Sequence, residues 1–131
     1  MMSTKEERSE TTIVTTGRAP VEFTTENGFS IVRKCELEPA LMDSPSGCHF
    51  LVRDPAAREF EVTVVFNTEM IELIQKQRAH GLSSGCSFWL ECAERTLGRY
   101  LWQADNPPPD GWLVIDWLPA VDLMLAASWE C

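Results

Sequence analysis

The sequence lacks the segments by which membrane, secreted and nucleic-acid-binding proteins are usually recognised. Its apolar runs are far shorter than the ~18 residues that a membrane helix requires, and no basic segment followed by an apolar run predicts a secretory signal. Basic residues are scarce, because 11 Lys and Arg stand against 20 Asp and Glu, for a net charge of −9. Nucleic acids and anionic membranes bind basic surfaces, so we expect neither as a partner.

Cysteine and histidine are too scattered to form a recognisable metal motif. The five Cys stand at positions 35, 48, 86, 92 and 131. No Cys-x2-Cys pair is among them, whereas structural zinc sites usually show such pairs. We therefore predict no metal ion, and no motif predicts a cofactor. Without a signal peptide, an odd number of Cys indicates reduced thiols in a cytoplasmic protein, most of them buried as small apolar side chains.

Alternating apolar residues predict an antiparallel sheet in the N-terminal half. Every second residue from Phe60 to Phe66 is large and apolar, which is the period of a strand with one buried face. An Asp-Pro turn at 54–58 predicts a hairpin with the apolar run before it. The pair Asn27-Gly28 is the strongest short hairpin signal in the chain. The predicted strands are 11–16, 21–25, 29–37, 49–53 and 60–66.

The period changes after Asn67, where apolar residues recur at the spacing of a helix. Met70, Ile71 and Ile74 fall on one face of this segment. Asn67 or Thr68 is suited to cap its start, and Gly81 is well placed just after its end. We therefore predict a helix that extends to His80.

Two later segments fit both a helix and a hairpin or strand. Residues 87–102 place Trp89, Ala93 and Leu97 on one helical face, with Ser87 as a cap, but 86–92 also alternates. Good helix formers and the lack of an Asn-Gly or Asp-Gly turn favour a helix. Residues 119–129 alternate as a strand would, yet their Leu, Met and Ala content favours a helix as well.

Together these patterns predict one α+β domain over residues 11–131, preceded by a disordered polar tail at 1–10. We expect an antiparallel sheet of four or five strands from the N-terminal half, packed against two or three helices from the C-terminal half. The apolar run 112–117, after three consecutive Pro, is most simply a short strand. Its Asp116 either ends the strand or is buried with a partner.

Tryptophan and acidic residues are concentrated at the C-terminal end. Residues 100–131 hold Trp at 102, 112, 117 and 129, five acidic residues and no Lys or Arg, so they carry −5 of the net charge. The simplest interpretation is that these Trp fill the core; walls of a ligand pocket are another. Our first hypothesis is a non-enzymatic interaction or adaptor module, in which Trp102, Trp112, Asp110 and Asp116 bind a cationic protein partner. The oligomeric state stays open, with a homodimer as one possibility.

The second hypothesis is a small ligand-binding domain or enzyme with a pocket near His80 and the loop 81–85. His80 is the weak catalytic candidate, because a helix C-terminus favours the imidazolium and suits a general acid. A solvated His at a helix end is the simpler interpretation. The loop matches the G-x-S-x-G pattern of a hydrolase nucleophile elbow, but that elbow requires a strand before it and a helix is predicted there.

Overall fold

The computed structural model describes residues 21–131, which hold a five-stranded sheet and four helices. The predicted tail at 1–10 and the predicted strand at 11–16 lie outside the described residues. The α+β class predicted from the sequence is confirmed, with most strands in the first half and the longer helices in the second. None of the helices in residues 21–131 is both long and apolar enough to cross a membrane.

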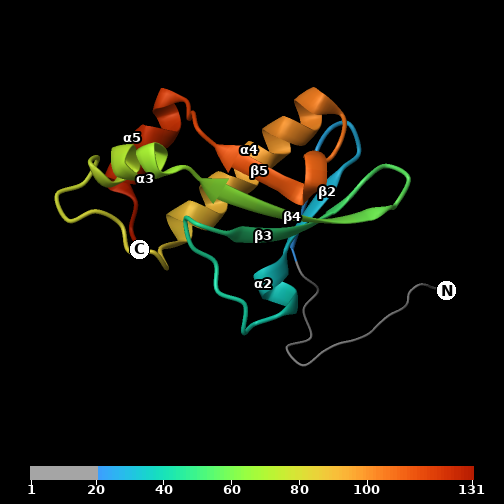
Figure 1. Ribbon diagram of the computed structural model, residues 1–131, viewed down its shortest axis with the longest axis horizontal. Helices are drawn as coiled ribbons and strands as arrows, with labels where there is room; N and C mark the ends of the chain where they lie inside the picture. Colours follow the sequence, from blue (N-terminus) through green and yellow to red (C-terminus); the bar gives the residue numbers. More distant parts are fainter. Residues whose placement is uncertain (1–20) are drawn as a thin grey trace.

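Four strands follow one another as antiparallel neighbours, and a fifth joins them from the C-terminal end. They are β1 (Glu22–Thr24), β2 (Ser30–Arg33), β3 (Cys48–Arg53), β4 (Glu59–Phe66) and β5 (Trp112–Ile115), in that spatial order. β5 runs parallel to β4, so the sheet is mixed where a purely antiparallel one was predicted (Figure 1). A parallel neighbour needs a long crossover, and the helices between β4 and β5 provide it.

The predicted hairpins are present, and the alternation of apolar residues sets their register. Phe50 pairs with Val62 in the β3–β4 hairpin, and both are fully or almost fully buried. A shift by one residue would turn these side chains to the other face and bring acidic residues inward. Gly28 adopts φ 94° in the turn between β1 and β2, a conformation that explains the Asn-Gly pair there.

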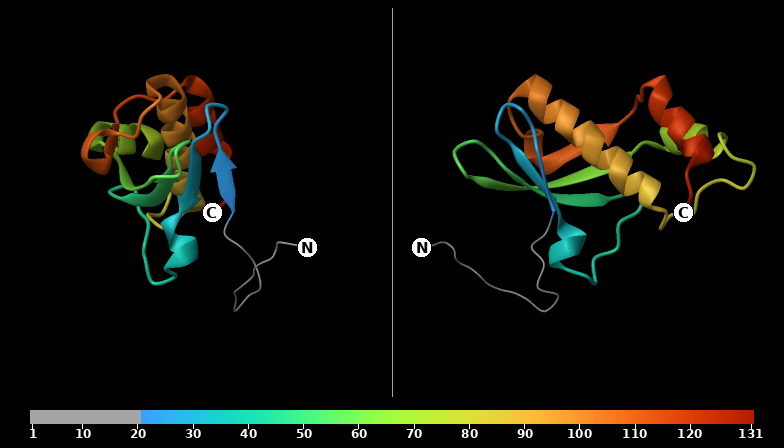
Figure 2. Two further views of the ribbon diagram at one scale, coloured as in Figure 1. Left: turned by 90° about the vertical axis from the view of Figure 1, so that its right-hand side faces the viewer. Right: turned by 180° about the vertical axis from the view of Figure 1, so that it is seen from behind.

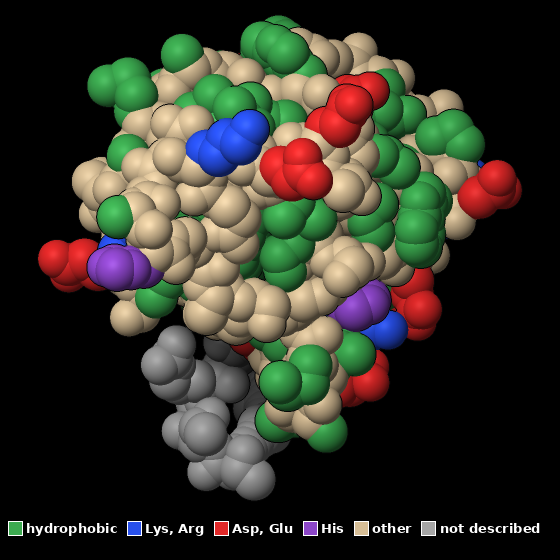
Figure 3. All heavy atoms as spheres, turned by 60° about the vertical axis from the view of Figure 1, so that its left-hand side comes forward, with side chains coloured by type: hydrophobic (Ala, Val, Ile, Leu, Met, Phe, Trp, Pro, Cys, Tyr) green, Lys and Arg blue, Asp and Glu red, His purple; other side chains and the backbone are tan. Residues whose placement is uncertain are grey.

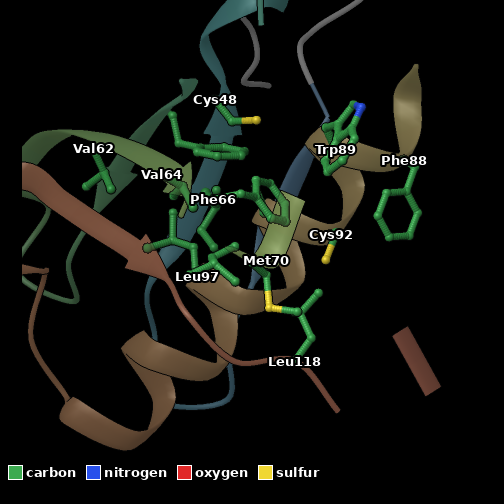
Figure 4. Packing of buried hydrophobic residues seen from close by; sticks show 14 of the residues in the cluster. Cys48, Val62, Val64, Phe66, Met70, Phe88, Trp89, Cys92, Leu97 and Leu118 are labelled. Carbon is green, nitrogen blue, oxygen red and sulfur yellow. The ribbon is translucent and has the colours of Figure 1, made fainter. Parts of the chain in front are cut away.

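One long helix, α4 (Ser87–Ala104), covers one face of the sheet and supplies six of the 21 residues of the buried hydrophobic core. In Figure 2 the helix lies across the strands, and the close view in Figure 4 shows Trp89, Cys92 and Leu97 of α4 meeting the strand residues. The rings of Phe66 and Trp89 meet edge to face with centroids 5.2 Å apart. The helix predicted for 87–102 is therefore confirmed against the hairpin.

The glycine inside α4 is explained by its neighbour on β1. A Cβ added at Gly98 would lie 3.3 Å from the ring of Phe23, so a glycine lets the strand residue approach the helix backbone. Arg33 at the end of β2 also ties the sheet to α4, since its guanidinium makes two hydrogen bonds of 2.9 and 3.1 Å to Glu94 of that helix. This bond to Glu94, opposed by partial burial, raises the pKa of Arg33.

Helices α3 (Thr68–Gln75) and α5 (Ala120–Ser128) pack at one end of the sheet (Figure 1). The predicted cap is confirmed, as the Asn67 side chain accepts the Met70 N–H at 2.8 Å. The predicted extension of α3 to residue 80 is wrong. The Gln75 side chain bonds both backbone groups of Leu82, so the chain folds back over the helix end.

Two other local predictions are corrected by the structure. The strand expected over 29–37 ends at Arg33, and Lys34–Leu37 forms a one-turn helix, α2, beside an ion pair of 3.3 Å between Lys34 and Glu61. The N-cap of α4 is Cys86 and has no side-chain cap bond, so Ser87 is not the cap. The helix favoured for residues 119–129 is confirmed as α5.

Candidate functional site

Three of the four predicted binding residues lie together on the short segment that contains β5. Asp110 occupies the 3₁₀ turn η2 (Pro109–Gly111) immediately before the strand, and Asp116 follows the strand directly. Both carboxylates are exposed, which settles Asp116 as a residue at the strand end. Trp112 is 53% exposed and shares a strand face with Val114, which is also exposed.

The apolar exposure continues past β5 into α5. Trp117 in the connecting segment is 69% exposed and Met124 on α5 is 70% exposed. Val121 lies one helical turn before Met124 and is exposed as well. We call the following set the β5–α5 surface: Trp112, Val114, Trp117, Val121 and Met124, with the carboxylates of Asp110 and Asp116. Figure 3 brings forward the end of the molecule with α3 and α5, where hydrophobic side chains reach the surface beside acidic ones.

Trp102 does not belong to this surface. It is 56% exposed on the flank of α4, where it lines a groove of about 400 Å³ between that helix and β1. The interpretation of the C-terminal Trp as core residues is therefore wrong for Trp102, Trp112 and Trp117. Only Trp129 fits it, with its indole against Phe88 and a hydrogen bond of 3.0 Å to the Ser87 hydroxyl.

One C-terminal acidic residue is buried and does not contribute to the exposed charge. Asp122 on α5 is 2% exposed, and its Oδ1 accepts a hydrogen bond of 2.8 Å from Arg95 of α4. Arg99 approaches the other carboxylate oxygen at 3.6 Å. That oxygen, Oδ2, has no hydrogen-bond partner within residues 21–131. The surface of residues 100–131 is thus less negative than their composition indicates. The charge of Asp122 is buried and is offset by Arg95 and Arg99, which precede this segment in the sequence.

His80 and the loop 81–85 occupy a different region from either of these features. Because α3 ends at Gln75, His80 is an exposed turn residue and not a helix-terminal one. The loop is held by its own contacts, since Leu82 is buried and Ser83 accepts a hydrogen bond of 2.8 Å from the Trp89 indole. His80 does not line any of the three grooves that flank α4 within residues 21–131. Its catalytic role stays a prediction.

The expectation that all five Cys are free thiols is wrong. A disulfide joins Cys86 at the start of α4 to Cys131, with the Cα atoms 5.0 Å apart. Burial raises the pKa of Cys48 and of Cys92 to about 12, so both are protonated and unreactive at neutral pH. Burial and a hydrogen bond to Asp43 raise the pKa of Cys35 as well. None of these three free cysteines has the lowered pKa of a nucleophile.

Asp43 also orients the imidazole of His49, the residue that follows Cys48. Its carboxylate lies 3.2 Å from Nδ1 of His49 and accepts the backbone N–H of that residue at 2.9 Å. A carboxylate on Nδ1 is how a catalytic or metal-binding imidazole is positioned. Within residues 21–131, however, His, Cys, Asp and Glu form no group of three or more able to hold a metal ion. Cys48 is instead fully buried and donates to the Ser44 carbonyl at 3.3 Å.

Sequence reasoning did not find the arginines of α4 or the aromatic residue that faces them. Arg95, Arg99 and Phe23 come together only when β1 folds beside α4, and nothing in their spacing indicates it. Comparison with family models, with curated proteins and with solved structures gave no match for this chain. The function must therefore be inferred from these surfaces.

Proposed function

We propose that the chain is a non-enzymatic interaction module, which binds a basic segment of a partner protein on the β5–α5 surface. The observation that carries the proposal is the exposure of Trp112 and Trp117, at 53% and 69%, beside the exposed carboxylates of Asp110 and Asp116. Trp is enriched among the residues that dominate binding energy at protein interfaces. Its ring also attracts Arg and Lys cations, which the two carboxylates would pair with.

The position of β5 supports a partner in extended conformation. β5 lies at the end of the strand order and, among residues 21–131, pairs with β4 alone. Its other edge therefore offers backbone N–H and C=O groups to an added strand, which is a common mode of peptide recognition. Alternate side chains of such a strand would meet Trp112 and Val114 on one face. A net charge of −9 would speed the encounter with a basic partner at low salt.

The proposal is tested with a defined peptide and its uncharged counterpart. The probe is an extended peptide that alternates Arg with Val, and the matched control carries citrulline, a neutral isostere, in place of each Arg. Titration calorimetry should give saturable binding that weakens as salt is raised, because surface ion pairs are screened. We expect the citrulline peptide to bind at least about tenfold more weakly, since each hydrogen bond to a charged group contributes about 1.5–3 kcal/mol.

Variants of the surface locate the binding. Trp112→Ala and the double change Asp110→Asn/Asp116→Asn should each weaken the Arg peptide by about tenfold or more. Trp102→Ala is the matched control, because it removes an equally exposed Trp outside the β5–α5 surface, and it should leave the affinity within about twofold. Equal binding of both peptides, or equal binding by Trp112→Ala, would refute the proposal. Sedimentation of the free protein comes first, because self-association through this surface would compete with the peptide.

A further inference from the structure

The groove between β1 and α4 has walls of two kinds, aromatic and cationic. Arg95, Arg99, Trp102 and Gln103 line it from successive turns of α4. Gly98 lies between them and is buried. Phe23 of β1 closes the opposite side with its ring against Gly98. Figure 2 shows β1 beside the C-terminal half of α4, and residues of both elements line the groove. A volume of about 400 Å³ falls in the range of small-molecule sites.

Arg95 is held more tightly by other side chains than Arg99 is, and this leaves Arg99 available to bind a ligand. Arg95 is engaged by the buried Asp122 at 2.8 Å. Within residues 21–131, Arg99 makes only a hydrogen bond of 3.4 Å to the Thr96 hydroxyl and an ion pair of 3.6 Å with the same carboxylate. Two guanidinium groups share one buried carboxylate, so the cluster they form with Asp122 carries a charge of about +1. Glu26 also lines the groove, from the exposed turn side.

We propose that this groove binds a small aromatic carboxylate. The planar guanidinium of Arg99 matches the two oxygens of a carboxylate. The rings of Phe23 and Trp102, exposed by 38% and 56%, offer apolar faces against which an aromatic ring packs edge to face or offset. An organic anion of this kind satisfies both walls. An uncharged aromatic would bring no negative charge to Arg99, and inorganic anions would leave the rings exposed.

This site is independent of the proposed interaction surface, because Trp112, Asp110 and Asp116 do not line the groove. Arg99 and Gln103 do reach a second groove, of about 390 Å³, on the other side of α4 beside Trp117. Trp102 therefore reports on the carboxylate site alone, and Trp112 reports on the partner surface alone. Failure of one proposal leaves the other standing.

The test uses indole-3-carboxylate as the ligand and indole-3-carboxamide as its uncharged counterpart, by titration calorimetry on the full chain. We expect saturable binding of the carboxylate with a Kd of about 1 mM or tighter, as small ligands of this size allow. The carboxamide should bind at least about tenfold more weakly, because it is uncharged and offers the guanidinium one acceptor oxygen in place of two. No saturation by the carboxylate, or equal affinity of the two ligands, would overturn the proposal.

Three variants separate a site from non-specific binding. Arg99→Gln and Trp102→Ala should each weaken the carboxylate by about tenfold. Lys76→Gln removes an exposed cation outside the groove and should leave the affinity within about twofold. If Arg99→Gln does not fold, Arg99→Lys keeps the charge but loses the planar pair of donors, and it should bind with reduced affinity. Unchanged affinity in Arg99→Gln, or in Arg99→Lys where that variant replaces it, contradicts the assignment.

Discussion

Removing the buried carboxylate of Asp122 is the change that most directly tests how α5 is fixed to α4. In Asp122→Asn the side chain keeps its shape but loses its charge, so its ion pairs with Arg95 at 2.8 Å and Arg99 at 3.6 Å are lost. Both arginines retain access to water, with 31% and 42% of their side chains exposed. They can therefore rehydrate, which limits the cost of the change.

The expected loss of unfolding free energy follows from these exposures. Breaking a fully buried ion pair costs about 3–5 kcal/mol, whereas one charged hydrogen bond contributes about 1.5–3 kcal/mol. With one partner buried and two partly hydrated, we expect Asp122→Asn to cost about 2–3 kcal/mol. For a domain of this size each kcal/mol moves the thermal midpoint by roughly 3–6 °C. The midpoint should therefore fall by roughly 6–18 °C.

The assay is urea unfolding followed by circular dichroism, at neutral pH and moderate salt. Asp116→Asn is the matched control, because it removes an exposed carboxylate at the end of β5 and should change stability by less than about 0.5 kcal/mol. The double variant Asp122→Asn/Arg95→Gln completes a thermodynamic cycle, with an expected coupling of at least about 1 kcal/mol. A cost for Asp122→Asn below about 0.5 kcal/mol, or additivity in the cycle, would refute the reasoning.

The other stability predictions concern the disulfide, the free thiols and one turn. Cys131→Ser opens a disulfide of sequence separation 45 and should lower the free energy of unfolding by about 2–4 kcal/mol in non-reducing denaturant titrations; no change under those conditions would contradict the pairing. Thiol titration of the native protein at pH 8 should leave Cys48 and Cys92 unreacted until denaturant is added, because burial raises their pKa to about 12. Gly111→Ala should cost more than about 1 kcal/mol, since φ is +68° and the new Cβ meets a backbone carbonyl of β4. Gly85→Ala, with open space around it, is the control that should stay within about 0.5 kcal/mol.

The sequence predicts those parts of the fold that local periodicity controls. The β3–β4 hairpin follows from alternation, because a slip in register would place Glu59 and Glu61 in the core. The start of α3 follows from the Asn67 cap, which needs only neighbouring residues. α4 is more demanding, since its segment alternates as well, and helix propensity decides the matter correctly.

Features that depend on distant residues escape such reasoning. The early end of α3 rests on the Gln75 side chain reaching Leu82, a contact that no local pattern indicates. The parallel pairing of β5 depends on the crossover through the helices, and the disulfide depends on where the chain end lies. The sequence says which residues are acidic, but only packing decides that Asp122 is buried while Asp116 is exposed.

The candidate site shows the same division. The segment that contains Asp110, Trp112 and Asp116 is one continuous stretch, so its composition was enough to select it. Trp102 belongs with Phe23 instead, from the other end of the chain, because β1 folds beside α4. The unusual density of Trp and acidic residues thus pointed to this segment of the chain. Composition alone could not show that Trp102 lies apart from the other three residues, because that depends on the fold.

The most direct test of the proposed interaction surface is to follow the five indole N–H signals by nitrogen-15 NMR during titration with the Arg-Val peptide. Each Trp gives one signal, and single Trp variants assign them. The proposal predicts that the signals of Trp112 and Trp117 shift and saturate, while that of the buried Trp89 stays in place and that of Trp102 moves little. Shifts centred on Trp102 with none at Trp112, or an equal response to the citrulline peptide, would contradict it.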